Sequence, residues 1–155
     1  MPVRIYRPTS PGRRKSSVNT YAQLTKGAKP YKKLLRRKMS QAGRNFTGKI
    51  TVRHRGSGNK NHYRQVDFIQ NRFNLVATVT QIEYDPNRSA FIALVTYSDG
   101  AKSYVLATEG MKVGQQIVSS KERVDVKDGN RTQLQYIPTG IPVHNIEITP
   151  GKGGA

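Results

Sequence analysis

The positive charge of this 155-residue chain is confined to its first half, and this asymmetry limits which part can fold into a compact domain. Residues 1–74 contain 19 Lys and Arg and a single acid, Asp67, whereas residues 75–155 contain eight basic and eight acidic residues. The first half therefore carries the whole net charge of +18. Because so many like charges cannot be buried together, the sequence predicts a basic extension joined to a neutral folding module.

The first 60 residues are expected to be extended. Prolines at positions 2, 8, 11 and 30 remove backbone donors, and glycines at 12, 27, 43 and 48 add backbone freedom. Residues 31–39 are the best helix candidate in this part, interpreted as one or two solvated turns. A basic amphipathic helix on a membrane surface is the alternative for this segment.

From residue 50 onwards the sequence shows the two-residue period of β-strands. Strands are predicted at residues 50–55, 63–68, 75–84, 91–97, 104–106, 113–118 and 143–148. In the strand at 75–84, the alternation places Val76, Thr78, Thr80, Ile82 and Tyr84 on one face. The strand at 91–97 is the most apolar and is expected to be central, with Leu94 buried. Turns are predicted at 85–88 and 98–100, so the pattern indicates an all-β fold built on a small barrel.

The residues that carry most enzyme chemistry are scarce or badly spaced. The chain has no Cys, which excludes a disulfide framework, a Cys-based zinc site and a thiol nucleophile. His54 and His62 flank a glycine-rich loop without a nearby acid, and His144 lies in an alternating segment. This is not a metal-ligand pattern. No apolar run approaches the length of a membrane span. We therefore expect no enzyme, no protein-held metal and no membrane partner.

Three basic clusters predict a polyanionic partner. They are Arg13-Arg14-Lys15, the cluster at 32–38, and Arg53-His54-Arg55 with Lys60 and Arg64. Each Lys or Arg placed on a phosphate releases condensed counterions, which favours binding. Aromatic and His residues interleaved with the basic residues favour RNA, because unstacked bases can stack on them; these are Tyr6, Tyr21, Tyr31, Phe46, His54, His62 and Tyr63. The alternatives are a free nucleic-acid chaperone or histone-like protein, a peripheral membrane domain and, third, an enzyme.

Five segments resemble protein two of the large ribosomal subunit, in its bacterial and organellar form. They are PTSPGRR (8–14), GRN (43–45), GKITVRHRGSGNKNHYRQVDF (48–68), IEYDPNRSAFIALVTYSDG (82–100) and VHNIEITPGKGG (143–154). The resemblance implies a basic RNA-binding arm at residues 1–60, an OB-like barrel at 61–118 and the opening strands of an SH3-like barrel at 119–155. The family continues beyond the position where this chain ends, so residues 119–155 are expected to become ordered on a partner, which is either a second chain supplying the remaining strands or the rRNA itself.

The function implied by the resemblance is that of a structural constituent of the large ribosomal subunit. Such a protein binds large-subunit rRNA and supports subunit assembly, subunit association and the region around the peptidyl-transferase centre. The expected partners are this rRNA and other ribosomal proteins, in a cytoplasmic or an organellar ribosome. No cofactor is expected apart from structural Mg²⁺ ions shared with the rRNA.

The basic clusters and the resemblance together give twelve expected RNA contacts. They are Arg13, Arg14, Lys15, Arg44, Arg53, His54, Arg55, Lys60, Tyr63, Arg64, Arg88 and Lys152. The glycines at 151, 153 and 154 are expected to let the backbone approach RNA closely. The chain departs from the family at GSGNK (56–60), where GGGHK is common, so an imidazole expected at position 59 is replaced by Asn59.

Overall fold

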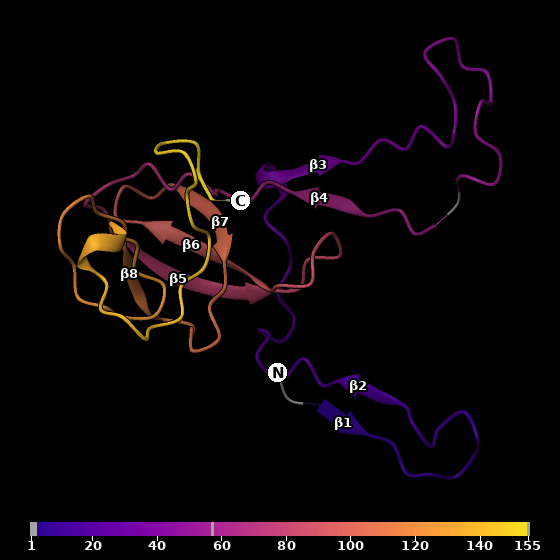
Figure 1. Cartoon of the computed structure of the whole chain (residues 1–155), viewed down its shortest axis with the longest axis horizontal. Helices are drawn as coiled ribbons and strands as arrows, with labels where there is room; N and C mark the ends of the chain where they lie inside the picture. Colours follow the sequence, from indigo (N-terminus) through magenta and orange to yellow (C-terminus); the bar gives the residue numbers. More distant parts are fainter. Residues whose placement is uncertain (1–2, 57, 155) are drawn as a thin grey trace.

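The computed structural model describes residues 3–56 and 58–154, and it is built from short strands (Figure 1). The strands are β1 (Val3–Ile5), β2 (Ser17–Asn19), β3 (Leu35–Arg37), β4 (His62–Arg64), β5 (Val76–Glu83), β6 (Ile92–Tyr97), β7 (Lys102–Leu106) and β8 (Gln116–Val118). Single 3₁₀ turns lie at η1 (Lys32–Leu34) and η2 (Leu134–Tyr136). The prediction of an all-β fold is therefore confirmed.

Four antiparallel strands, in the order β7-β6-β5-β8, form the main sheet and carry the core. Residues of β6 alternate between two buried clusters: Ala93, Val95 and Tyr97 belong to one, Ile92 and Leu94 to the other. The strand is thus buried on both faces, as its continuous apolar sequence predicts. The turn from β6 to β7 is also as predicted, because Gly100 has a φ of 80° and donates its N–H to the carbonyl of Tyr97 at 2.9 Å.

A β-bulge in β5 changes which of its residues are buried. The register of β5 against β6 shifts between Val79 and Gln81, and the Thr80 hydroxyl donates to the carbonyl of Leu94 at 2.8 Å. An extra residue in one strand reverses the inward and outward positions that follow it. Ala77 and Val79 are consequently buried before the bulge and Ile82 after it, whereas Val76 and Tyr84 are exposed. The five residues predicted to share one face of the strand are therefore divided by the bulge between its two faces.

Two hairpin arms project from one side of this sheet module, toward the right in Figure 1. The short arm (residues 3–19) pairs β1 with β2, and the long arm (residues 31–66) pairs β3 with β4. The accessible surface is 11870 Å², whereas roughly 7,900 Å² is expected for a compact monomer of this mass. The large surface is that of a compact sheet with two extended arms, and the predicted domain bounds at 1–60, 61–118 and 119–155 stay predictions.

The long arm is fixed to the sheet through the hydroxyl of Tyr104, a fully buried side chain of β7. This hydroxyl accepts the backbone N–H of Tyr31 at 2.8 Å and donates to the carboxylate of Glu83 at 3.0 Å. Burial is the main cause that raises the pKa of Tyr104 to about 12, so the hydroxyl keeps its proton. Burial also raises the pKa of Glu83, although the Tyr104 hydrogen bond and the charge of Arg64 act the other way.

Three predicted elements do not form as expected. Residues 31–39 contain one 3₁₀ turn followed by β3, because the segment pairs with β4 in place of continuing a helix. Residues 50–55 form a single bridge, between Arg44 and Ile50, and the strand ends where His54 adopts a φ of 58°. No strand forms among the described residues 119–154, including the predicted one at 143–148. The assignment of this segment to a second barrel stays a prediction.

Leu94 is 3% exposed, as predicted, and truncating its side chain tests how much it contributes to the stability of the core. We expect Leu94→Ala to lower the free energy of unfolding by about 2–5 kcal/mol, because it leaves a cavity between two well-packed strands. Arg53→Ala, at an exposed position of the long arm, is the control and should leave stability unchanged within about 0.5 kcal/mol. Chemical denaturation of both variants measures this, and the opposite ranking would contradict the assignment of core and surface.

Candidate nucleic-acid interface

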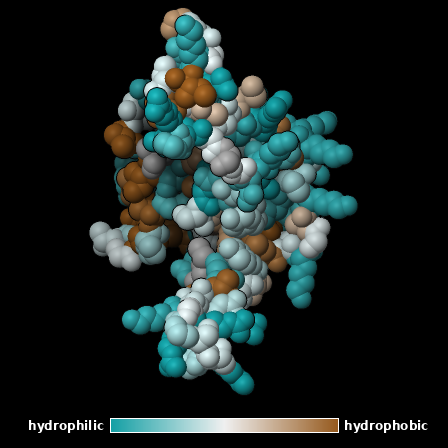
Figure 2. All heavy atoms as spheres, turned by 90° about the vertical axis from the view of Figure 1, so that its right-hand side faces the viewer, coloured by the Kyte–Doolittle hydropathy of each residue, from teal (hydrophilic) through white to brown (hydrophobic). Residues whose placement is uncertain are grey.

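The long arm collects two basic clusters that are far apart in the sequence. In the β3–β4 hairpin, Arg36 lies opposite Tyr63 and Arg37 opposite His62. The cluster at 32–38 therefore runs beside Lys60 and Arg64. Residues 31–66 contain eleven Lys and Arg and no acid. Figure 2, which views the molecule from the side of the arms, shows many hydrophilic side chains reaching outward from this face.

The tip of the long arm is a compact loop held by its own hydrogen bonds. The side-chain oxygen of Asn45 accepts the backbone N–H groups of Thr47 and Lys49, each at 3.0 Å, and the Thr47 hydroxyl at 2.6 Å. Arg44 donates to the carbonyl of Gly48 at 2.8 Å. Gly43 has a φ of 70°, and a Cβ there would lie 2.1 Å from the carbonyl oxygen of Val52. Glycine is therefore required at this position.

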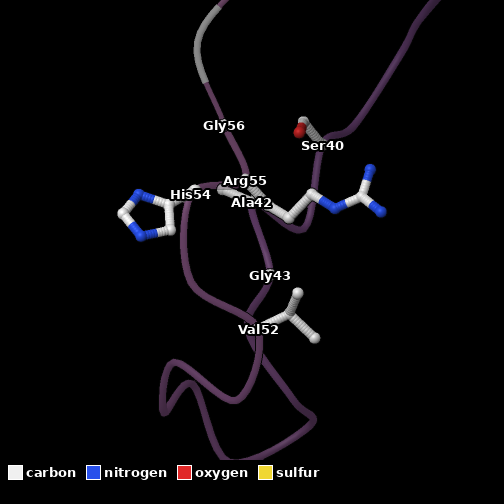
Figure 3. A pocket seen from close by; sticks show the side chains of 7 residues that line it. All are labelled: Ser40, Ala42, Gly43, Val52, His54, Arg55 and Gly56. Carbon is white, nitrogen blue, oxygen red and sulfur yellow. The ribbon is translucent and has the colours of Figure 1, made fainter.

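Next to this tip, residues 40–43 and 52–56 line an open hollow, shown in Figure 3. Its lining includes Ala42 and His54, both with positive φ, which turn the chain on each side. The side chains of His54 and Arg55 point to opposite sides of the loop (Figure 3). Together with Arg53 they are exposed, so they face any partner that surrounds the arm.

The short arm carries the remaining cluster of the first half. Arg13, Arg14 and Lys15 lie in the turn between β1 and β2, where the N–H groups of both arginines donate to the carbonyl of Ser10. Arg13 lies over the ring of Tyr6 at 5.4 Å, with Arg4 at 5.9 Å. These contacts keep cations close to an aromatic face.

Ten of the twelve predicted contact residues are exposed. Six of these belong to the long arm, namely Arg44, Arg53, His54, Arg55, Lys60 and Tyr63. The two exceptions are partly buried. Arg64 donates through Nη1 to the carbonyl of His62 at 3.1 Å, and its Nε is buried without a hydrogen-bond partner. Its charge thus faces the protein as well as the solvent.

Arg88 is engaged inside the protein. Its Nε donates to the carboxylate of Asp85 at 2.6 Å, and its guanidinium lies 5.5 Å from the centre of the Phe68 ring. The Asp85 side chain is fully buried, and the Arg88 side chain is 18% exposed. Burial alone would raise the pKa of Asp85, but the Asn87 N–H and the Arg88 guanidinium outweigh it and lower the pKa. The geometry gives Arg88 a structural role.

The glycine-rich loop near residue 152 is occupied by a carboxylate of its own chain. Glu147 accepts the N–H groups of Gly151 at 2.9 Å and Gly153 at 3.2 Å, and it is paired with Arg131. The Gly151 hydrogen bond is the main cause that lowers the pKa of Glu147. These donors are therefore not available to phosphate, whereas Lys152 between them is exposed.

The three glycines of this loop differ in what surrounds them. A Cβ on Gly154 would lie 2.0 Å from the side-chain oxygen of Asn145, and one on Gly153 would lie 3.1 Å from the side chain of Ile69. Contacts within the protein therefore favour glycine at both positions, and the close approach of this loop to RNA stays a prediction. Gly151 has open space around it.

Six further exposed cations of the long arm are not among the twelve predicted contacts, namely Lys32, Lys33, Arg36, Arg37, Lys38 and Lys49. Arg36 and Arg37 belong to a basic cluster that was recognised, but their partner strand was hidden by the helix-like spacing of residues 31–39. Among residues 3–56 and 58–154, no helix is long and apolar enough to cross a membrane. The same described residues contain no group of three or more His, Asp or Glu that could hold a metal ion.

Comparison with known families identifies the family of the central part of the chain. Residues 31–119 match the family model described as "Ribosomal Proteins L2, RNA binding N-terminal domain", which covers more than half of the chain. The chain belongs to the ribosomal protein L2 family. The match begins at Tyr31, which donates its N–H to the Tyr104 hydroxyl, and ends one residue after β8. It therefore contains the long arm and the main sheet. The short arm lies outside the match.

Membership of the L2 family fixes the general character of the protein. The matched part is an OB-like RNA-binding module of the large ribosomal subunit. The role of such a domain is structural: it binds ribosomal RNA, and the protein is associated with the ribosome in translation. The exposed basic residues of the long arm lie inside the matched region and form the candidate interface.

The buried ion pair at residues 85–88 gives a pH-dependent prediction. Asp85→Asn should lower the free energy of unfolding by about 1.5–3 kcal/mol at neutral pH, because a charge-assisted hydrogen bond is lost. Since the pKa of Asp85 lies below its ordinary value of 3.8, the stability from its ionised form is fully present above that value. It is lost as the pH falls through the lowered pKa, so the two proteins should converge there.

Thermal melts of Asp85→Asn and the parent at several pH values measure this difference. Asp125→Asn is the matched control, because Asp125 is 79% exposed and pairs with Lys127 at 3.2 Å on the surface. Its effect should stay small. Equal losses for both variants would contradict a structural role for the Asp85–Arg88 pair.

Proposed function

We propose that this protein is a structural constituent of the large ribosomal subunit whose two arms bind large-subunit rRNA while the barrel docks on its surface. The main support for this proposal is the long arm, a projecting hairpin with eleven basic residues and no acid. Its ionic partner must be a polyanion, because the arm carries no acid to neutralise its charge. A narrow hairpin also fits the irregular crevices of folded RNA better than a convex domain does.

The proposed RNA contacts fall into two classes. Arg13, Arg14, Lys15, Arg44, Arg53, Arg55, Lys60 and Lys152 are exposed cations suited to phosphates. His54 and Tyr63 are exposed rings within the basic arm and are suited to bases or sugars. Arg64 and Arg88 are proposed to act mainly by holding the barrel and the base of the long arm in shape.

Within the ribosome, the proposed role includes supporting subunit assembly, subunit association and the region around the peptidyl-transferase centre. Other ribosomal proteins are proposed as neighbours, in a cytoplasmic or an organellar ribosome. The proposal includes no catalysis and no cofactor held by the protein alone. Mg²⁺ ions bound to the rRNA would be shared at the interface, where they screen phosphates that the arms do not reach.

Co-sedimentation tests this proposal against its alternatives. The full chain should migrate with large-subunit particles in magnesium-containing sucrose gradients and stay with them after washing at moderate salt. A histone-like protein or a free chaperone would spread over all nucleic acid in the lysate. Migration with vesicles in place of particles would contradict the proposal and favour the membrane alternative.

Salt dependence tests the electrostatic mechanism. If about six or more phosphates are contacted, affinity for large-subunit rRNA should fall roughly a thousandfold between about 50 and 200 mM salt. Replacing Arg53, Arg55 and Lys60 by Gln should reduce the slope of log K against log salt by about 2–3, since each lost phosphate contact removes slightly less than one unit. Filter binding over a salt series measures both quantities.

A control variant with the same charge change separates the arm from net charge. Lys112, Arg123 and Lys127 are exposed residues of the neutral half, and replacing all three by Gln also removes three positive charges. The slope of this variant should stay close to that of the parent. Equal slopes for the two triple variants would show that the arm is not the main electrostatic contact. Deleting residues 1–45 is a poorer test, because it also removes Thr25 and Tyr31. These residues form hydrogen bonds with Ile82 and Tyr104 of the main sheet.

A further inference from the structure

One large apolar side chain stands alone at the tip of the long arm. Phe46 is 101% exposed, the highest value among the exposed large hydrophobic residues of the described chain. Aromatic side chains normally bury roughly 150–250 Å² each, and leaving that apolar area in water is unfavourable. The barrel core does not reach this loop, and no other part of the described chain covers the ring. The loop therefore presents the ring to something outside the protein.

The loop around Phe46 is held by hydrogen bonds within the loop itself. Asn45, directly before it, closes the turn: its side-chain oxygen accepts three hydrogen bonds, and its backbone N–H donates to the carbonyl of Lys49 at 2.9 Å. Gly48 donates its N–H back to the carbonyl of Asn45 at 3.0 Å. A partner that receives the ring thus pays little conformational entropy for ordering the loop.

The charges around Phe46 indicate the chemistry of this partner. Arg44 and Lys49 flank the ring in sequence, and Arg53 and Arg55 follow on the returning chain. The first acid of the chain is Asp67, beyond the long arm. A surface with this charge lies against phosphates, and the apolar faces that a phosphate-rich partner offers are those of its bases.

We propose that Phe46 is a base-stacking residue: it inserts beside an unpaired base of the bound RNA while its neighbouring cations hold the adjacent phosphates. This inference rests on the proposed function and adds a contact that does not depend on charge. Stacking on an aromatic side chain tolerates any base, so Phe46 contributes affinity and position and not sequence preference.

The chain contains no Trp, so a single Trp reports directly on this position. In the full-length Phe46→Trp variant, binding to large-subunit rRNA should quench the indole fluorescence and protect it from acrylamide, a neutral quencher. Val113→Trp is the matched control, since Val113 is 53% exposed in the neutral half. Its indole should keep its intensity and its accessibility to acrylamide.

Affinity measurements give an independent readout. Phe46→Ala should weaken binding about tenfold, within the range reported for loss of one base stack, without changing the salt slope. Phe46→Leu keeps apolar area but no π-face and should recover only a small part of the loss, whereas Phe46→Tyr should recover most of it. Thermal melts should be the same for all these variants, because the ring makes no contact with the core.

The outcomes separate this inference from the proposed function. If the parent fails to bind rRNA, the proposed function is wrong. If the parent binds with the expected salt dependence but the Phe46→Trp indole stays accessible and Phe46→Ala binds normally, only the stacking role is wrong. A change in the salt slope of Phe46→Ala would also overturn it, because the ring would then act by shaping the cationic loop.

Discussion

The hydrogen bond from the backbone of Tyr31 to the hydroxyl of Tyr104 is the contact on which the geometry of this protein depends. It joins the first residue of the long arm to a buried side chain of β7, and the same hydroxyl binds Glu83 on β5. Tyr31 and Leu34 pack on the cluster formed by Val66 and Leu94 beside this bond. A mainly apolar site excludes water, which strengthens the hydrogen bonds inside it and makes an unpaired partner costly. The arm therefore leaves the main sheet in a defined direction although it has no core of its own.

The sequence was sufficient for the parts of the fold that are decided locally. Continuous apolar residues in β6 predict a central strand, and the SDG sequence predicts the turn that follows it, because both depend on neighbouring residues. The bulge at Thr80 depends on how two strands align across the sheet, so strict alternation along β5 does not predict which of its residues share a face. The helix-like spacing of residues 31–39 is equally misleading, since pairing with β4 and the packing of partly buried Tyr31 and Leu34 on the sheet outweigh local propensity.

The candidate interface shows the same division. Density of basic residues and absence of acids are properties of the sequence, and they point to the long arm without any structure. Whether a given cation is available depends on distant partners, and the sequence does not reveal them. Arg88 is held by buried Asp85, and the glycine-rich loop is closed by Glu147. The tip of the long arm was not predicted, because the three hydrogen bonds that the Asn45 side-chain oxygen accepts are visible only in the fold.

The base of the long arm has a topological consequence for assembly. The long arm is joined to the main sheet at both of its ends. One end is held by the hydrogen bond of Tyr31, and the other by the bridge from Val66 to Tyr104. A loop fixed at both ends cannot be passed lengthwise through a closed ring of RNA, as a free tail can. It enters a crevice tip first, or the RNA folds around it afterwards. The order of events is thereby restricted: either the crevice is open when the folded protein arrives, or the arm is present before the RNA closes.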